Sequence, residues 1–476
     1  MIKEYRAHPL MILRFIKPIL FILVFPIIRA VIQYIKFGII TGFVTWEIFI
    51  FGLIVFYGIM NCRAFRVIFD DKSITVKKGF ILKQCAVIEL SKISSVNSSQ
   101  SPFDALFGSM SYSINTEAGS RNKSDFEFKL RKKDARELTK SLFGDEEVDR
   151  VHFSAVKVAI TAAATSSAFS GMLIGVPIIN QAGKLLGIGL EEMFEEITHI
   201  SQRMQTTVPP IVNTVTLIIL AGYIISFVYS FIKYINFRIV LGDEKLEVRS
   251  GFFVKSRTSF KKKAIRNVLI VQNPLMRLLK RYSIKVSVGG FGEAKSESQI
   301  VVPAVRNDHI NEEFLRYFAF LEPEGERIYP KRNRENKMRF LGWPLLYIGV
   351  ALAVFITLGV VFKDFTALII FVGAIVLCVL LYYTYICLYE YKYSNIILGK
   401  NVYIKGVKGF RNCRFYSPRQ NIGQIKLTRL LPDKFFGTCR LKIIISSEGA
   451  DNIKIRHIDY EKALKNLNDC FNLNKI

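Results

Sequence analysis

One short pattern gives the clearest indication of the fold: Ile93-Ser-Ser-Val96, followed by Gln100 and Pro102. The pattern occurs three times in the chain with nearly constant spacing. Matched spacing over three copies is much stronger evidence of a repeat architecture than any single copy. The other two copies are Ile265-Arg-Asn-Val268 with Gln272 and Pro274, and Ile422-Gly-Gln-Ile425 with Arg429 and Pro432.

Similar segments surround each copy of this motif. A strand-like run that ends in a glycine turn precedes it, and an alternation of apolar and polar residues follows it, as in Tyr282 to Val288. Such alternation predicts β-strands, and apolar residues at helical spacing then predict a closing helix. Each repeat is therefore expected to form a small barrel or sandwich that is capped by one helix. The turns contain Gly79, Gly251 and Gly409, and the expected helices cover residues 133–143, 308–321 and 459–473.

Six apolar stretches separate the repeats and fall into three pairs. Each is long enough, or nearly so, to cross a hydrocarbon core of about 30 Å, which takes about 20 helical residues. Pro18, Pro26 and Arg29 interrupt the first of them. Each pair is expected to form a two-helix membrane hairpin. The six stretches cover about residues 17–34, 43–62, 158–179, 211–232, 340–362 and 365–387.

The chain is both strongly apolar and strongly basic. Hydrophobic residues make up 51%, and 66 Lys and Arg against 39 Asp and Glu give a formal net charge of +27. This combination excludes a disordered chain, which needs low hydrophobicity, and a chain buried wholly in lipid, where ionised groups are costly. Lys and Arg flank the paired spans but are rare in the turns within them. Both termini and all three polar regions are therefore expected in the cytoplasm, in a multi-pass protein of the cell membrane without a cleavable signal peptide.

The sequence resembles the bacterial pleckstrin-homology domain 2 family, whose members are also called membrane-flanked domain proteins. The resemblance spans almost the whole chain. It rests on the opening Arg6-Ala7-His8-Pro9 and on the Ile-x-x-Val-x-x-x-Gln-x-Pro pattern from Ile93 to Pro102. It is strongest with YdbT-type members, which have three membrane pairs and three such domains.

This resemblance implies a pleckstrin-homology-like fold of about seven strands and one helix, with no established enzyme activity. It also implies a shorter one-domain membrane relative as a partner, and a link to the handling of antimicrobial peptides at the cell envelope.

The predicted fold class is a set of α-helical membrane hairpins combined with α+β or all-β domains. Three repeats are expected, and each is a two-helix hairpin followed by a pleckstrin-homology-like barrel with a C-terminal helix. The hairpins are expected at 1–62, 151–233 and 331–387, and the domains at 63–150, 234–330 and 388–476.

The second hairpin contains a long external segment, about residues 181–210, between its two spans. Leu190, Phe194 and Ile197 are among its apolar residues at helical spacing, and its glutamates fall largely outside that stripe. This pattern predicts an amphipathic helix. One interpretation is a helix packed against the membrane spans, and the other is a docking surface for an extracellular cationic peptide.

The sequence contains no motif that indicates catalysis. A nucleotide-binding loop, an H-E-x-x-H motif, a G-x-S-x-G motif and clustered metal ligands are all lacking. We therefore expect no enzyme activity, no cofactor and no bound metal. The seven cysteines are odd in number and form no C-x-x-C pair, which favours reduced, structural cysteines.

The strongest indication of function in the sequence is a cluster of basic residues. Lys261, Lys262, Lys263 and Arg266 cluster at the start of the second motif and are the residues expected to contact an anionic surface. Close to an anionic inner leaflet, each such residue contributes about 1 kcal/mol. The cluster is either a solvated face of ordinary positive-inside topology or a specific lipid-headgroup or anion site. Nucleic-acid binding is not expected, because aromatic stacking residues are not interleaved with these charges.

The Gln-x-Pro part of the motif also has two interpretations. Pro102 and Pro274 lack an N–H donor and favour a turn or a strand edge. Gln100 and Gln272 could satisfy backbone groups at that turn, which is a structural role. The alternative is an edge at which domains associate, so the oligomeric state is left open.

Taken together, these features predict a non-enzymatic integral membrane protein that binds or scaffolds at the anionic inner leaflet. Membrane lipids are the expected partners, and a role in envelope stress or in the response to antimicrobial peptides is a further expectation. The alternative is a six-helix transporter or permease, with Arg29 and Glu47 as its ionisable groups within the membrane.

Overall fold

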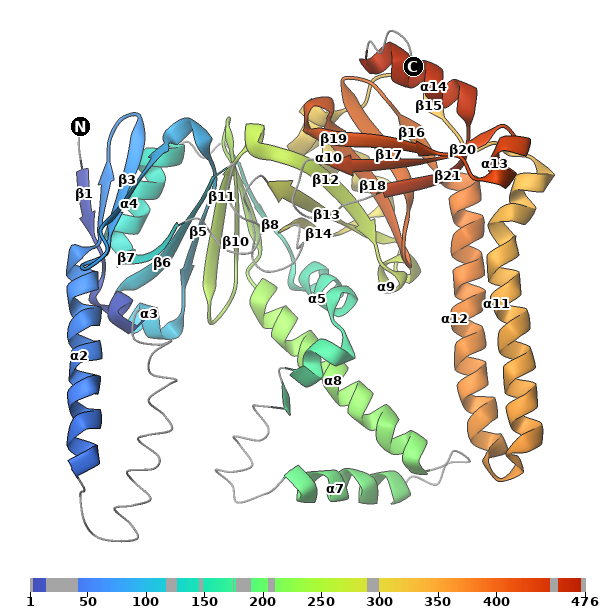
Figure 1. Cartoon of the computed structure of the whole chain (residues 1–476), viewed down its shortest axis with the longest axis horizontal. Helices are drawn as coiled ribbons and strands as arrows, with labels where there is room; N and C mark the ends of the chain where they lie inside the picture. Colours follow the sequence, from blue (N-terminus) through green and yellow to red (C-terminus); the bar gives the residue numbers. More distant parts are fainter. Residues whose placement is uncertain are drawn as a thin grey trace. The chain divides into compact units, whose positions relative to one another are not determined.

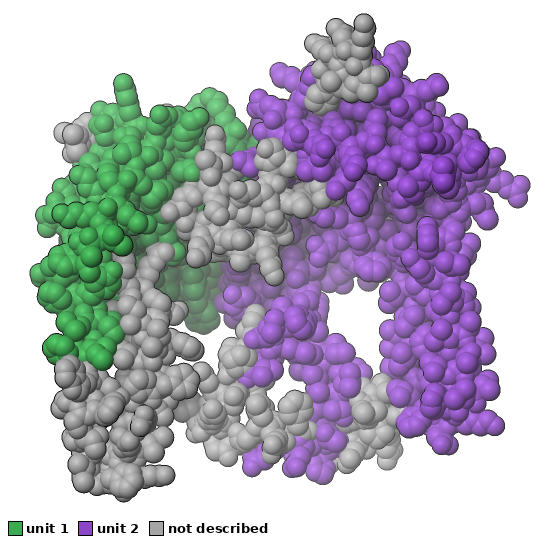
Figure 2. Space-filling model, viewed as in Figure 1, with its two compact units in different colours: residues 1–152, 238–265, 288–297 green, residues 153–237, 266–287, 298–476 purple. Residues whose placement is uncertain are grey.

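The computed structural model describes residues 3–13, 42–116, 126–144, 149–173, 175–176, 190–203, 210–288, 299–445 and 453–471. The first expected membrane span, at about residues 17–34, lies outside these ranges. The chain divides into two compact units, which Figure 2 colours separately. Unit 1 comprises residues 1–152, 238–265 and 288–297, and unit 2 comprises residues 153–237, 266–287 and 298–476.

Unit 1 contains two antiparallel β-sheets (Figure 1). The strand order is β1-β2-β3-β4 in the first sheet and β7-β6-β5-β11-β10-β9-β8 in the second. The α-helices described in this unit are α2 (Gly42–Ala64), α3 (Pro102–Leu106) and α4 (Lys132–Phe143). The strands are β1 (Lys3–Arg6), β2 (Arg66–Phe69), β3 (Ser73–Lys78), β4 (Gln84–Glu89), β5 (Ile93–Gln100), β6 (Ser109–Thr116), β7 (Phe126–Arg131), β8 (Asp149–His152), β9 (Arg238–Leu241), β10 (Lys245–Ser250) and β11 (Lys255–Lys261).

The core of unit 1 forms because its strands alternate in burial. In β3, Ile74 and Val76 are buried while the residues beside them are more exposed. Ile93 and Val96 of the repeat motif join this core, and α4 contributes Leu138. Burying each such aliphatic side chain stabilises the fold by about 1.5–3 kcal/mol. The strands and the closing helix expected around the first motif are therefore present.

Unit 2 also contains two antiparallel sheets, with strand orders β14-β13-β12-β18-β17-β16-β15 and β19-β20-β21. The strands are β12 (Ile265–Gln272), β13 (Arg281–Val288), β14 (Gln299–Arg306), β15 (Arg327–Ile328), β16 (Asn395–Ile397), β17 (Asn401–Lys408), β18 (Arg411–Pro418), β19 (Ile422–Thr428), β20 (Thr438–Ile445) and β21 (Ile453–Asp459). The α-helices described are α5 (Ala155–Thr165), α7 (Leu190–Arg203), α8 (Pro210–Tyr234), α9 (Pro274–Leu278), α10 (Ile310–Phe318), α11 (Arg334–Val361), α12 (Thr366–Tyr393), α13 (Leu431–Phe435) and α14 (Tyr460–Phe471).

The same order of elements recurs along the chain. One strand precedes each pair of expected spans, three strands follow the pair, and three further strands and a closing helix complete the set. The first strand of each set pairs with the second, although the expected spans separate them in sequence: β1 with β2, β8 with β9 and β15 with β16. The opening residues Arg6, Arg150 and Arg327 therefore lie in strands of the sheets.

Successive sets share sheets, and the sequence pattern did not predict this. The fifth strand of one set pairs with the fourth strand of the next, as β5 does with β11 and β12 does with β18. Such pairing satisfies backbone groups that an edge strand would leave open. The two joints run from Lys255↔Gln100 to Phe260↔Ser95 and from Val268↔Tyr416 to Gln272↔Asn412.

Three helices of the described chain are long and apolar enough to cross a membrane. They are α8, α11 and α12, and each matches one of the expected spans, at 211–232, 340–362 and 365–387. Helices α11 and α12 pack side by side (Figure 1), joined by a short turn at Lys363–Phe365. These three spans are confirmed as apolar helices.

The third expected span, at 158–179, is not one continuous helix. Helix α5 ends at Thr165, and Ser166 has an extended backbone. The Ser166 hydroxyl donates to the Ala162 carbonyl at 2.6 Å, and the Ser167 N–H donates to the Ser226 hydroxyl of α8 at 3.2 Å. Serine side chains compete in this way with the helical backbone bonds, which explains the break.

The external segment expected to contain an amphipathic helix does contain one. Helix α7 (Leu190–Arg203) lies within the expected range of 181–210 and packs against α8. The contact between α7 and α8 supports the interpretation that this helix packs against one of the expected spans.

Candidate functional site

The glutamine of the repeat motif bonds to the backbone at the start of the following strand. The Gln100 side-chain amide donates to the Ser109 carbonyl at 3.1 Å, and the Gln272 amide donates to the Arg281 carbonyl at 3.2 Å. Both bonds close the same turn, which is a structural role. The apolar members Ile93, Val96, Ile265 and Val268 are buried, and Pro102 and Pro274 begin α3 and α9.

A buried acid lies under this turn in unit 1. The Asp104 carboxylate accepts hydrogen bonds from the hydroxyls of Ser101 at 2.8 Å and Ser109 at 2.7 Å, and the Lys129 ammonium lies 2.5 Å from it. Burial alone would raise the pKa of Asp104, but these donors, Lys129 first, hold that pKa below its ordinary value. The charged acid therefore fixes the short helix α3 in place.

The corresponding acid in unit 2 ties a long apolar helix to the sheet. Asp433 of α13 is fully buried, and Arg339 of α11 donates to its carboxylate. The Leu430 N–H donates to the same carboxylate at 3.1 Å. Burial alone would raise the pKa of Asp433, but the bonds from Leu430 and Arg339 hold it below its ordinary value. Helix α11 is thereby anchored to the turn.

The turn at α9 uses a different anchor. Met276 is buried at the position that Asp104 and Asp433 hold in the other two turns. The next residue, Arg277, lies over the rings of Tyr389 and Tyr385 of α12, 4.9 and 5.1 Å from their centroids. A guanidinium over an aromatic face is attracted by the ring quadrupole. Among the described elements of unit 2, the short helices α9 and α13 are thus each held by one of the long apolar helices α12 and α11.

The end of unit 1 at which α2 finishes is apolar. The Phe80 N–H donates to the Asn61 side chain of α2 at 3.0 Å, which fixes the β3–β4 turn to that helix. The pairing of Lys255 with Gln100 places the β10–β11 turn and α3 at one end of the shared sheet. Exposed apolar clusters of this kind mark membrane or protein contacts. The exposed residues are Phe80, Ile81 and Leu82, Phe103, Leu106 and Phe107, and Phe252, Phe253 and Val254.

The basic residues singled out in the sequence lie elsewhere. Lys261 pairs with Lys245 at the end of the β10–β11 hairpin that is far from its apolar turn. The Lys261 ammonium donates to the Leu90 carbonyl at 2.6 Å, and Lys263 forms an exposed ion pair with Glu244 at 3.3 Å. Lys262 lies in the same short 3-10 helix as Lys263, and Arg266 lies in β12.

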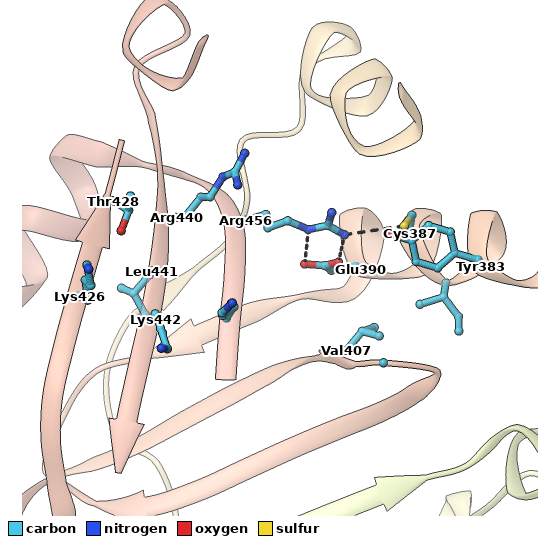
Figure 3. A pocket seen from close by; sticks show the side chains of 13 residues that line it. Tyr383, Cys387, Glu390, Val407, Lys426, Thr428, Arg440, Leu441, Lys442 and Arg456 are labelled. Carbon is cyan, nitrogen blue, oxygen red and sulfur yellow. Dashed lines mark hydrogen bonds and ion pairs between the residues drawn. The ribbon is translucent and has the colours of Figure 1, made fainter. Parts of the chain in front are cut away.

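A different basic site occurs in unit 2. A cavity of about 580 Å³ lies between α12 and the sheet β19-β20-β21 (Figure 3). Among the described residues that line it, Glu390 is the single acid, against five cationic side chains. The cationic residues are Lys426, Arg440, Lys442, Lys454 and Arg456.

Three lysines form a row across this sheet. Lys426 of β19 lies directly opposite Lys442 of β20, and Lys442 lies directly opposite Lys454 of β21. Their neighbours Leu441 and Ile443 are buried in the core, so the lysines project from the other face of the sheet. Like charges placed directly opposite each other destabilise a sheet. A bound anion would remove that repulsion.

The fifth cation of the cavity is already paired. The Arg456 guanidinium donates through Nε to Glu390 at 3.1 Å and through Nη2 to the same carboxylate and to Cys387 at 3.8 Å (Figure 3). Burial alone would lower the pKa of Arg456, but the bond to Glu390 raises it above its ordinary value. Arg440 lies 3.5 Å from the carboxylate of the buried Asp433, so the lysine row supplies the charge available to an outside anion.

Replacing Glu390 by glutamine is expected to raise the affinity of this cavity for an anion about fivefold. The substitution adds one unit of positive charge, which is worth about 1 kcal/mol near an anionic surface. Native mass spectrometry of the full-length protein, titrated with a short-chain phosphatidylglycerol, would measure the change. The matched control is Glu244→Gln, an exposed acid of unit 1. Equal increases in the two variants would contradict a local effect.

A second basic cavity of about 410 Å³ in unit 2 is less suited to an anion. Lys405 and Arg414 lie directly opposite each other in β17 and β18. However, Arg414 lies over the ring of Tyr282 at 5.1 Å and Lys405 over the ring of Tyr393 at 5.3 Å. Burial and the nearby Arg414 lower the pKa of Lys405, and the rings partly compensate these charges.

The sequence holds a signal for the lysine row. Arg440-Leu441-Lys442 and Ile453-Lys454-Ile455-Arg456 alternate basic and apolar residues, which places all the basic side chains of each strand on one face. The alternation predicts strands, but the row becomes visible only once the strand register is known.

Comparison with known families agrees with this architecture. A family model described as a bacterial PH domain matches residues 12–145 and 186–317, which together make up more than half of the chain. The chain therefore belongs to the bacterial PH domain family, and it contains two repeated β-sheet domains of this kind together with apolar helices that fit a membrane-associated protein. Searches of curated proteins and of solved structures returned no match.

Proposed function

We propose that this chain is a non-enzymatic, multi-pass membrane protein that binds anionic lipid headgroups at the inner leaflet through the cavity beside α12. The observation that carries the proposal is the row Lys426–Lys442–Lys454, whose mutual repulsion an anionic headgroup would relieve.

The proposal includes a third PH-like domain, formed by the set from β15 to β21 with α14. Its element order is that of the two preceding sets. Its short helix α13 carries the buried Asp433 where α3 carries Asp104. This would give the three-domain organisation of the YdbT-type members.

The position of the cavity favours a lipid over a soluble anion. Four residues of α12 line it and belong to the last turns of an apolar helix long enough to span a membrane: Tyr383, Ile386, Cys387 and Glu390. Tyr385 and Tyr389 lie in the same turns, and tyrosine is enriched at the level of lipid headgroups. Lys and Arg flank the spans on the side of the sheets, which supports a cytoplasmic position for the domains and both termini.

Within the cell envelope, we propose that headgroup binding serves a scaffold that acts in envelope stress or in the response to antimicrobial peptides. The family resemblance supports this role and the shorter one-domain relative as a partner. The transporter alternative depends on Arg29 and on the Glu47 side chain, both of which lie outside the described residues.

The test is lipid retention by the full-length protein in which Lys426, Lys442 and Lys454 are replaced by glutamine. We expect at least a tenfold loss of affinity for phosphatidylglycerol and little change for phosphatidylcholine, because about 1 kcal/mol is lost for each lysine removed. Native mass spectrometry with each lipid in turn measures both values.

The matched control replaces Lys261, Lys262 and Lys263 by glutamine, which removes the same charge from the cluster that the sequence singled out. If this control loses phosphatidylglycerol and the first variant retains it, the proposed site is wrong and the cluster in unit 1 is the contact. Equal losses in both variants would indicate that only total charge matters.

A further inference from the structure

Among the described residues, two edge strands lack the partners that their counterparts have. In the described part of the chain, β4 is the last strand of the sheet β1-β2-β3-β4, and β19 is the first strand of the sheet β19-β20-β21. β4 is the fourth strand of the first set, as β11 and β18 are of the later sets. β19 is the fifth strand of the third set, as β5 and β12 are of the earlier sets.

The two joints inside the chain have an identical register. Gln100 lies seven residues after the motif's Ile93 and pairs with Lys255, ten residues before Ile265. Gln272 lies seven residues after Ile265 and pairs with Asn412, ten residues before Ile422. One rule of pairing is thus used twice, between different sequences, within one molecule.

From this rule we infer that β19 of one molecule pairs antiparallel with β4 of a second copy of the same chain, and that the protein assembles head to tail. The same offset places Leu427 opposite Cys85 of the second copy, and Ile425 opposite Val87. This inference goes beyond lipid binding, although it uses the third domain proposed above.

The apolar side chains of the two edges fit this pairing. The Val87 side chain of β4 is apolar and yet 67% exposed, although β4 pairs with β3 along its other edge. Ile425 and Leu427 are partly buried and pack against the core of unit 2. Opposite them, Val87 would become buried, as the corresponding residue Tyr416 of β18 already is opposite Val268 of β12.

The pairing of two different edges also explains why the assembly would not end at a dimer. A contact between two different edges is heterologous, so a dimer retains one free β4 and one free β19. Such contacts build rings or filaments rather than closed dimers. An unprotected edge strand is the template on which strand addition occurs. The interpretation of the repeat motif as an edge for self-association thus becomes specific: the associating strands are β19 of one copy and β4 of the next.

Disulfide trapping in native membranes tests the inference. In the Leu427→Cys variant of the full chain, the new thiol faces the native, exposed Cys85 of the second copy. Directly opposite residues of antiparallel strands have Cα atoms about 4.5–5.5 Å apart, within the range that a disulfide can bridge. Mild oxidation is expected to give a ladder of products at two, three and more chain masses, which reduction removes.

Two controls make the result decisive. Thr428→Cys places the thiol on the other face of β19 and should give no ladder. Adding Cys85→Ser to Leu427→Cys should abolish the ladder, whereas products that persist and stop at two chains would show that two β19 strands pair instead. A disulfide within one chain, or no product above the Thr428→Cys level, would overturn the inference.

A second pair of cysteines keeps the inference testable if Leu427→Cys prevents folding. Ile425→Cys with Val87→Cys, in a Cys85→Ser background, tests the same register at the neighbouring position on the same face. The ladder should reappear with this pair. Failure of both pairs in correctly inserted protein would overturn the inference, and lipid retention through the lysine row would remain unaffected.

Discussion

Replacing Asp433 by alanine is expected to lower the free energy of unfolding around α13 by about 3–5 kcal/mol, because the change leaves buried charge without its partner. Asp433 is fully buried, and Arg339 is only 17% exposed. Arg440 lies 3.5 Å from the same carboxylate. Without the acid, two guanidinium groups would repel each other at the point where α11 meets the sheet.

The buried thiol of Cys439 gives a local measure of this effect. Cys439 is fully buried in the core of unit 2, and burial raises its pKa to about 12, so it reacts only when this part of the structure opens. In full-length protein that retains only this cysteine, the rate of thiol modification under native conditions reports the opening free energy. We expect modification to be at least a hundredfold faster in Asp433→Ala.

Two further variants separate charge from packing. Asp433→Met combined with Arg339→Leu imitates the turn at α9, where Met276 is buried, and should recover much of the loss. Asp104→Ala removes the corresponding acid of unit 1 and should leave the modification of Cys439 unchanged. If the double variant is as labile as Asp433→Ala, the uncompensated charge is not the cause.

The long apolar helices and the strands within each set could be predicted because their signals are local. The spans at 211–232, 340–362 and 365–387 needed only an apolar stretch of sufficient length, and α8, α11 and α12 match them. The interruption after Thr165 could not be predicted, because the Ser167 N–H is satisfied there by the Ser226 hydroxyl of α8, which only the packing of the helices brings into reach.

The shared sheets and the lysine row could not be predicted, because both depend on the register of distant strands. Ser95 pairs with Phe260, which is far away in sequence, and the sequence of neither strand indicates that the other is its partner. Likewise, Lys426, Lys442 and Lys454 each have the ordinary appearance of a solvated surface lysine. Only the pairing of β19, β20 and β21 places them in one row.

The stability of unit 2 is expected to fall as the pH drops from about 6.5 to about 4, because of His457. Burial, and next the nearby Arg339, lower the pKa of His457 from its ordinary 6.5 to about 4, although Asp433 at 3.5 Å acts in the opposite direction. Arg440 and Arg456 also disfavour the charged ring, and the Phe340 ring packs against it at 4.8 Å.

The sign follows from proton binding. Between pH 4 and 6.5, the unfolded chain carries a proton on His457 and the folded chain does not, so acid favours unfolding. Each unit of pKa difference is worth about 1.4 kcal/mol, so the full effect amounts to about 3 kcal/mol. Above pH 6.5 the contribution of this residue is constant.

Cys439 again provides the measurement, since it pairs directly with Ile458 beside this histidine. Its modification rate, divided at each pH by that of the unfolded chain, should rise steeply below pH 6.5 in the native sequence. His457→Asn should remove most of that rise, because asparagine does not titrate and tolerates the positive φ of 58° at this position. A native protein equally protected at pH 4.5 and pH 7 would show that the ring is not held neutral by its surroundings. Equal slopes in the native and variant chains would assign the pH dependence to another group.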